Sequence, residues 1–259
     1  MTALRILSWN VNSVRVRMEQ LLKTVELYRP NVLLLQETKV VDDGFPDSPL
    51  RKQGFELELN GQKTYNGVAI ASRFPMSEVA RSLPSGFLSR QKRILCATIR
   101  GVRIANVYVP NGGNPTLDRF AEKLRFLEEL RELARSSTEA GPFVIAGDFN
   151  VAPSPDDVHD PEEMDGMVCY HPGERKRFAG LLSEGLVDLY RKHQPSGKAY
   201  SWWDYRGGAF RRNKGMRLDH VLVSADLESS SISCRIHTEV RSWDRPSDHA
   251  PILAEISIP

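Results

Sequence analysis

The sequence contains little cysteine, and this restricts how the fold can be held together. Its 259 residues include only three cysteines, Cys96, Cys169 and Cys234, and no two of them form a CxxC pair. A disulfide framework or a zinc cage needs more cysteines at closer spacing, so both are excluded. An odd number of scattered thiols is typical of a reducing compartment, and we therefore expect a cytoplasmic protein.

Long apolar runs and a strong excess of one charge are also missing. No run reaches the roughly 18 apolar residues of a membrane span, and the N-terminus lacks the layout of a signal peptide. The net charge is only +2, so local clusters would have to attract any polyanionic partner. We find no repeat and no Pro/Gly/Ser-rich linker. We expect one domain over residues 1–259, without membrane contact.

The apolar pattern predicts an α/β fold with layered sheets. Mostly apolar stretches, typical of buried strands, occupy residues 4–9, 32–35, 67–71, 94–99, 102–109, 143–147, 218–223 and 252–258. Helical spacing of apolar residues predicts helices over 14–25, 117–134 and 174–182. The acidic, proline-containing stretch 153–172 is expected to be a long surface loop, and such loops in compact enzymes are often functional.

Four of the predicted strands lead into polar residues that can face a common cleft. These residues are Asn10, Glu37, Asp148 with Asn150, and Asp248 with His249. For any single Asp or Asn, the commoner explanation is that it starts a turn. Glu37 has no turn chemistry and directly follows a core strand, so it needs a counter-charge or a metal. Oxygen donors without a Cys or His cluster suit Mg²⁺ or Mn²⁺.

Two Asp-His pairs occur, Asp219-His220 and Asp248-His249. Neighbouring residues of a strand face opposite ways, so neither pair can form an internal hydrogen bond. A cross-pair, in which Asp219 orients His249, is the alternative that suits catalysis. For His220 the simpler explanation is a surface histidine near a strand end.

Aromatic and basic residues alternate between positions 200 and 217. This pattern predicts a nucleic-acid surface, because aromatic rings stack on bases or sugars while arginines hold phosphates. The alternative is a core aromatic pair beside a solvated loop. If the segment is extended, one of the adjacent Trp202 and Trp203 lies in the core and the other faces the cleft. Arg15 and Arg17 would extend the basic rim.

Six segments, taken in order, resemble the exonuclease III family, the class II AP endonucleases of the endonuclease/exonuclease/phosphatase superfamily. They are SWNVNSVR (8–15), LQETK (35–39), YVPNG (108–112), GDFN (147–150), RLDH (217–220) and SDHAP (247–251). The resemblance covers almost the whole chain. It implies a four-layer α/β sandwich, in which two mixed β-sheets pack face to face with helices outside.

The resemblance also implies roles for individual residues. Asp148 would activate water, His249 supported by Asp219 would contact the scissile phosphate, and Tyr108 would lie near the leaving oxygen. Asn150 would hold the water or the phosphate. The implied set around Mg²⁺, with Mn²⁺ as an alternative, is Asn10, Glu37, Asp148, Asn150, Asp248 and His249. The implied DNA contacts are Asn12, Lys39, Asn111, Trp202, Arg206, Arg212, Met216 and Leu218.

The sequence departs from the family at the expected sugar pocket. Met216 stands where some relatives have a tryptophan, and Asn12 stands where some have an aspartate. A bulky residue in the 164–172 loop would favour trimming of 3′ ends over abasic cleavage. Beside Trp202 and Leu218, Met216 would give this pocket an apolar but altered wall.

The resemblance implies a DNA-repair phosphodiesterase that cleaves 5′ to abasic sites and processes 3′ ends of double-stranded DNA. We expect it to act as a monomer, near the nucleoid if the source is prokaryotic. One alternative is a 3′–5′ exonuclease or 3′-phosphatase with little abasic cleavage. Others are a related enzyme acting on a small phosphate ester and a DNA-binding module that has lost catalysis.

Overall fold

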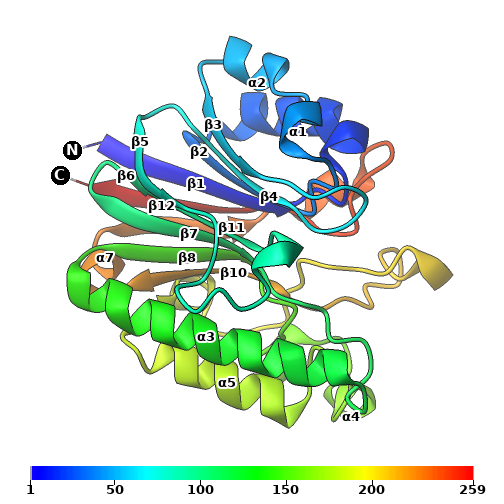
Figure 1. The fold of residues 1–259 in the computed structure, drawn as a ribbon. Helices are drawn as coiled ribbons and strands as arrows, with labels where there is room; N and C mark the ends of the chain where they lie inside the picture. The colour runs from blue at the N-terminus through cyan, green and yellow to red at the C-terminus, as the bar shows by residue number, and fades with distance from the viewer. Residues whose placement is uncertain (1, 259) are drawn as a thin grey trace.

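Two six-stranded β-sheets lie face to face at the centre of the computed structural model, which describes residues 2–258 (Figure 1). The first sheet has the order β11-β12-β1-β2-β4-β3, and the second has the order β5-β6-β7-β8-β10-β9. Each sheet contains one parallel pair, β1 with β2 and β7 with β8, among antiparallel pairs. Both sheets are therefore mixed, and the expected sandwich is confirmed.

The strands of the first sheet are β1 (Thr2–Asn10), β2 (Val32–Gln36), β3 (Glu56–Asn60), β4 (Val68–Ser72), β11 (Ser231–Ile236) and β12 (Ile252–Ile258). Those of the second are β5 (Met76–Ala80), β6 (Ile94–Ile99), β7 (Val102–Tyr108), β8 (Phe143–Asp148), β9 (Leu186–Asp188) and β10 (Asp219–Ser224). Most predicted strands agree with these bounds to within one or two residues.

Helices form the two outer layers (Figure 1). The first sheet is covered by α1 (Val14–Tyr28) and α2 (Ser48–Lys52), and the second by α3 (Asp118–Ala140) and α5 (Pro172–Leu182). The remaining helices are short: α4 (Pro161–Met164), α6 (Leu189–His193) and α7 (Ala225–Glu228). No helix among the described residues has the length and apolarity needed to cross a membrane.

The central strands are mostly apolar because both of their faces are buried. In β1, Leu4 and Ile6 pack between the two sheets, while Leu7 and Trp9 pack under α1. A strand covered on both sides shows a continuous apolar run rather than an alternating one. This explains why the central strands are visible in the sequence.

The four strands that the sequence did not predict, β3, β5, β9 and β11, are the four sheet edges. Edge strands bury less surface and carry more polar residues, which protects the edge from pairing with other chains. β3 reads ELELN and β5 reads MSEVA, and neither contains an apolar run.

The prediction of a surface loop over 153–172 is wrong in part. This stretch contains α4, and Val158, Cys169 and Tyr170 are almost fully buried within it. They pack against Met216 and Leu218 in a small separate cluster. The polar composition concealed this packing because its apolar residues are widely spaced.

Candidate active site

The carboxyl ends of β1, β2, β7 and β8 lie at the same end of the sandwich. Asn10 pairs with Gln36 across β1 and β2, and Tyr108 pairs with Asp148 across β7 and β8. The start of β10 is here too, since Asp219 pairs with Asp148. In Figure 1 this is the right-hand end, away from the two termini.

Three titratable side chains converge at this end. One ligand atom from each of Glu37, Asp148 and His249 lies within 4.8 Å of the other two. The amide Nδ2 of Asn10 lies between the two carboxylates, donating to Glu37 Oε1 at 2.8 Å and to Asp148 Oδ2 at 2.9 Å. Asn10 therefore holds the carboxylates of both sheets in a fixed relation.

His249 is oriented by Asp219. Its Nδ1 lies 2.8 Å from Asp219 Oδ2, which also accepts a hydrogen bond from Ser201 Oγ at 2.6 Å. The other ring nitrogen, Nε2, lies 3.7 Å from Asp148 Oδ2. The structure thus forms the cross-pair, with Nε2 of the imidazole directed into the site.

His220 is neither catalytic nor on the surface. It is fully buried, its Nε2 lies 2.8 Å from Val151 O, and its Nδ1 lies 3.0 Å from Arg217 Nη1. Because a carbonyl only accepts, Nε2 carries the proton and Nδ1 accepts from the arginine. The expectation of a surface histidine was therefore wrong, because β10 is an interior strand.

Burial and neighbouring charges shift the proton affinities in this cluster. Burial, with the nearby charge of Asp219, raises the pKa of Asp148 to about 7 despite the opposing charge of His249. Burial alone would lower the pKa of His249, but the charges of Asp219 and Asp148 raise it to about 10. At neutral pH the imidazole is therefore a cation beside a carboxyl that exchanges its proton readily.

The end of β7 and the loops after β7 and β8 place a phenol and two amides beside this cluster. Asn150 donates through Nδ2 to Val109 O at 3.0 Å and to Asp148 Oδ2 at 3.3 Å, and Asn111 Nδ2 donates to Asn150 Oδ1 at 3.1 Å. Burial and the charge of Glu37 raise the pKa of Tyr108 well above its usual value. Tyr108 therefore remains a neutral hydrogen-bond donor.

A cavity of about 300 Å³ opens beside these groups. Its polar end is formed by the cluster, with Tyr108, Asn111 and Asn150. Its apolar wall is formed by Trp202, Met216 and Leu218 together with Met164, Met167, Val168 and Cys169. Trp203, by contrast, is almost fully buried between Tyr200 and Phe210. One tryptophan of the pair thus lines the cavity and the other lies in the core.

The chain matches the model of the endonuclease/exonuclease/phosphatase family over residues 7–249. It belongs to this family. The chain is 33% identical to exodeoxyribonuclease III of Haemophilus influenzae, over 97% of this chain and 99% of that protein. The resemblance to the exonuclease III family is thus confirmed, and with it the assignment as a phosphodiester hydrolase.

Solved structures agree with this family membership. A 3′ phosphatase from Neisseria bound to a product DNA hairpin is 39% identical with a TM-score of 0.96, over 98% of this chain and 100% of that one. An AP endonuclease from Archaeoglobus fulgidus is 33% identical with a TM-score of 0.94, over the same shares of the two chains.

The donor set of this family member fits a hard divalent cation. Glu37 and Asp148 offer carboxylate oxygens, which Mg²⁺ and Mn²⁺ prefer. Of the six side chains expected around the metal, Glu37, Asp148 and His249 form the group, while Asn10 and Asn150 donate to Asp148. The two amides therefore orient a carboxylate.

Asp248 is outside the group of three ligand atoms but lines the same cavity. Its carboxylate accepts from Asn12 Nδ2 at 2.9 Å and from Trp202 Nε1 at 3.0 Å. Burial alone would raise its pKa, but the charge of His249 and these hydrogen bonds hold the pKa below its usual range. Lys39 pairs with Glu37 at 2.8 Å and also donates to Asn12. Asn12 thus links Asp248, which lines the cavity, to Lys39.

Arg206 and Arg212, expected to contact DNA, do not line the cavity. Both are exposed, and Arg206 pairs with Asp204 at 2.7 Å. Sequence analysis missed Arg93, whose guanidinium lies 4.7 Å from the centre of the Tyr108 ring. No local pattern marks Arg93, because it precedes β6 in an ordinary polar turn.

Several of the residues with left-handed backbone conformations lie at the site. Asn12, Glu37, Lys39 and Asn150 all have left-handed backbone conformations, with φ between 44° and 54°. Non-glycine residues adopt such angles at a cost and are found mainly where function requires them. Before Asp148 only glycine fits, because a Cβ on Gly147 would lie 1.9 Å from Val107 O.

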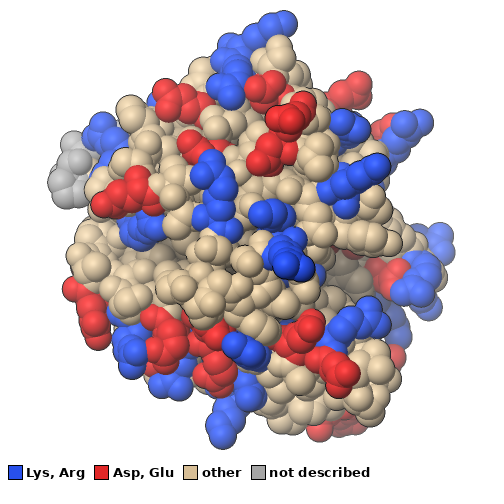
Figure 2. Space-filling view, in the orientation of Figure 1, with Lys and Arg blue, Asp and Glu red and all other residues tan. Residues whose placement is uncertain are grey.

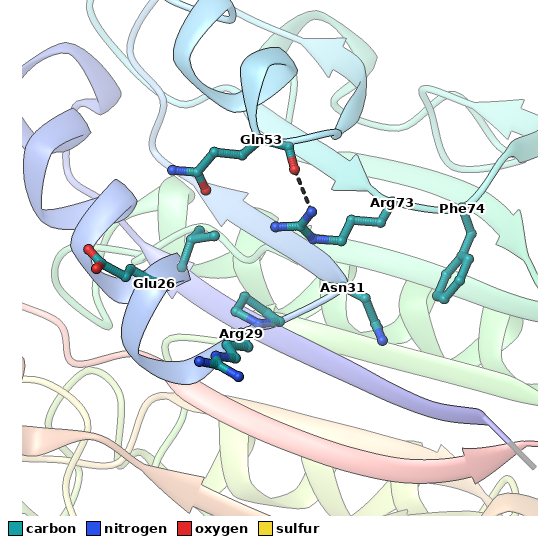
Figure 3. Close-up of a pocket in the computed structure, with 8 residues that line it drawn as sticks. Glu26, Arg29, Asn31, Gln53, Arg73 and Phe74 are labelled. Carbon is teal, nitrogen blue, oxygen red and sulfur yellow. Dashed lines mark hydrogen bonds between the residues drawn. The ribbon is translucent and has the colours of Figure 1, made fainter.

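A larger cavity, of about 700 Å³, lies at the opposite end of β1, β2 and β4 (Figure 3). It is an open depression lined by Arg29, Asn31, Arg73 and Phe74, and Arg73 donates to the backbone oxygen of Gln53. The described residues that line it include no carboxylate pair and no histidine, so the hydrolytic chemistry belongs to the smaller cavity.

Proposed function

We propose that this chain is a Mg²⁺-dependent DNA-repair phosphodiesterase. It cleaves double-stranded DNA 5′ to abasic sites and removes nucleotides or blocking groups from 3′ ends. The observation that carries the proposal is the convergence of Glu37, Asp148 and His249 at the mouth of an apolar cavity. The cluster suits a phosphodiester, and the cavity suits the sugar beside it.

Asp148 accepts the proton of the attacking water. Its Oδ1 is held by the backbone N–H of Asn150 at 2.9 Å, and its Oδ2 by the amide of Asn10. These bonds fix the carboxylate so that little reorganisation is needed in the transition state. A correctly positioned general base contributes about 10²- to 10⁴-fold to the rate.

The other groups stabilise charge on the phosphate. The cationic imidazole of His249 donates from Nε2 to a non-bridging oxygen, while Asp219 holds the ring. Tyr108 donates to the leaving oxygen, and Asn111 binds a phosphate oxygen. Mg²⁺, held by Glu37 and Asp148 when bound, supplies neutralisation of the negative charge on the phosphate and the leaving group.

The apolar part of the cavity receives the sugar at the lesion. Its volume of about 300 Å³ is small, and its wall of Trp202, Met216 and Leu218 offers no base-specific hydrogen bond. An abasic nucleotide enters at low cost because it loses no pairing and little stacking when it is flipped out. Selection therefore depends on which nucleotide can leave the duplex, while lysine and arginine side chains outside the cavity bind the DNA backbone.

The surface at this end suits a polyanion. In Figure 2 the surface is hollowed at the right, where the strand ends lie in Figure 1, and lysine and arginine side chains stand around the hollow together with some acidic ones. Asn12 and Lys39 are DNA contacts at the cavity mouth, and Arg206 and Arg212 reach the backbone further away.

A second candidate is a 3′-end-processing enzyme with little abasic cleavage. Met164, Met167 and Val168 project into the cavity from the 164–172 loop and restrict the space for a flipped sugar. The likeness to the Neisseria 3′ phosphatase, at 39% identity, also favours this alternative.

A cleavage assay decides between the two candidates. One labelled duplex carries a single tetrahydrofuran analogue of an abasic site, and a second carries a recessed 3′ end. We expect one nick at the analogue and shortening of the recessed strand, both with Mg²⁺ and neither with EDTA. A ladder without the nick would favour the 3′-end enzyme. Absence of both products would indicate a substrate other than DNA.

The pH dependence of cleavage follows from the two shifted groups. We expect kcat/KM to rise with pH as Asp148 loses its proton near pH 7, and to fall as His249 loses its proton near pH 10. A cation bound by Asp148 moves the first limb to lower pH, because positive charge favours the carboxylate. The alkaline limb should disappear in His249→Gln; its persistence would exclude His249 as the cation.

A further inference from the structure

A fully buried ion pair lies beneath the active site, between α3 and α5. Lys123 Nζ pairs with Glu174 Oε1, and both side chains have no exposed surface. Burying two charges is expensive, and an apolar pair of the same volume is often at least as stable. The pair therefore needs an explanation other than stability.

The lysine contacts the two loops that carry the catalytic amides. Its Nζ donates to the backbone oxygen of Asn111 at 3.0 Å and to that of Asn150 at 2.7 Å. With Glu174 as the third acceptor, the three N–H donors of the ammonium are all used. No apolar side chain can hold two carbonyl groups in this way.

The glutamate contacts the loop that forms one wall of the cavity. Its Oε1 accepts from the backbone N–H of Cys169 at 3.1 Å, and its Oε2 accepts from that of His171 at 2.9 Å. Residues 164–169 of this loop supply Met164, Met167, Val168 and Cys169 to the cavity wall. One ion pair thus connects the catalytic amides to the pocket.

We propose that Lys123 and Glu174 are positioning residues that set the distance between the catalytic amides and the pocket wall, and thereby the preference for abasic sites over 3′ ends. The proposal rests on the function proposed above. Cleavage within a strand requires the sugar in the pocket and the phosphate on the amides at the same time. Trimming of a free 3′ end tolerates more movement between them.

The test variant is the double substitution K123M/E174Q, which leaves no unpaired buried charge. The comparison variant is R131M/E184Q, because Arg131 on α3 and Glu184 just after α5 form a partly exposed ion pair at 2.6 Å. The control pair connects the same two elements but does not line the cavity.

We expect kcat for nicking at the tetrahydrofuran analogue to fall about 10²-fold in K123M/E174Q, the cost of a displacement of about 1 Å. KM should change less than about threefold, and 3′ trimming should fall less than about tenfold, because the free end tolerates the same displacement. The control should retain both activities. Equal losses of nicking and 3′ trimming in K123M/E174Q would overturn the proposal, since a structural role alone predicts them. Equal effects of K123M/E174Q and R131M/E184Q on these activities would also overturn it.

Hydrogen exchange of the 164–172 segment provides a readout that does not require activity. We expect faster exchange in K123M/E174Q, even where its melting temperature equals that of the control. Unchanged exchange would overturn the positioning role. A wild-type chain that cleaves no DNA would instead refute the proposed function, and hydrogen exchange would still test the ion pair.

Discussion

Replacing Asp148 by asparagine lowers the turnover of abasic DNA by about 10³-fold or more and leaves DNA affinity within a few-fold of wild type. Asparagine has the same shape but cannot accept the proton of the attacking water, and general-base catalysis contributes up to about 10⁴-fold. The oxygen of the introduced amide can still accept from the N–H of Asn150, so the loop keeps its place. The loss therefore falls on chemistry rather than on binding.

The measurement is single-turnover cleavage of the tetrahydrofuran duplex, beside fluorescence anisotropy of the same duplex without cleavage. Asp47→Asn is the matched control, because Asp47 is an exposed carboxylate that pairs with Arg51 beside α2. A variant that binds and cleaves like wild type would exclude Asp148 as the base. Loss of binding with unchanged turnover would contradict the catalytic assignment altogether.

Replacing Arg217 by methionine has the largest expected effect on stability. Arg217 is fully buried and donates to Asp157 Oδ1 at 2.6 Å and to Asp188 Oδ2 at 2.8 Å. Its removal leaves two buried carboxylates without their main counter-charge, which typically costs about 3–5 kcal/mol. For a chain of this size we expect the melting temperature to fall by roughly 6–20 °C.

This effect depends on pH in a defined direction. Burial alone would raise the pKa values of Asp157 and Asp188, but the charge of Arg217 holds both below their usual range. Groups with a lowered pKa stabilise the fold above their unfolded value, about 4, and lose this contribution as the pH falls through the folded value. The difference between wild type and Arg217→Met should therefore shrink below about pH 4.

Thermal unfolding between about pH 3 and 8 measures this difference, a range that spans the unfolded pKa of an aspartate. Arg5→Met is the control, since Arg5 pairs with Glu255 at 2.6 Å in a partly exposed position and should contribute less than about 1 kcal/mol. A decrease in melting temperature in Arg217→Met that is as small as the decrease in the control would contradict the stabilising role. So would a difference that does not change with pH.

Arg217 also shows how stability and function share one short segment, residues 216–218, just before β10. It lies between Met216 and Leu218, which line the cavity, while its own side chain points to the opposite side and binds the two aspartates. The network thus fixes the pocket wall from behind. Partly folded Arg217→Met protein should consequently lose abasic cleavage before it loses its secondary structure.

The sequence by itself determined the central strands and the positions along the chain of the polar residues that meet at the candidate site. Strands such as β1 and β8 are buried on both faces, so most of their residues are apolar and the strands are easily recognised in the sequence. Glu37 was identifiable for the opposite reason, since a charge directly after such a run has no local explanation. The six ordered segments then indicated the family.

Only the tertiary structure showed which strands form the sheet edges, which side chains pair with each other, and which buried groups hold the site in place. The edge strands β3, β5, β9 and β11 bury too little to leave a pattern. His220 and His249 each follow an aspartate in the sequence. His220 nevertheless contacts the buried Arg217, whereas His249 faces the site, because the order of the strands places the two histidines differently. Lys123 reads as an ordinary residue of a charged helix. The groups that accept its hydrogen bonds are brought together only in the folded chain, because they lie on loops that are distant in sequence. Local sequence patterns indicate burial and turns, but they do not identify the partners of a side chain.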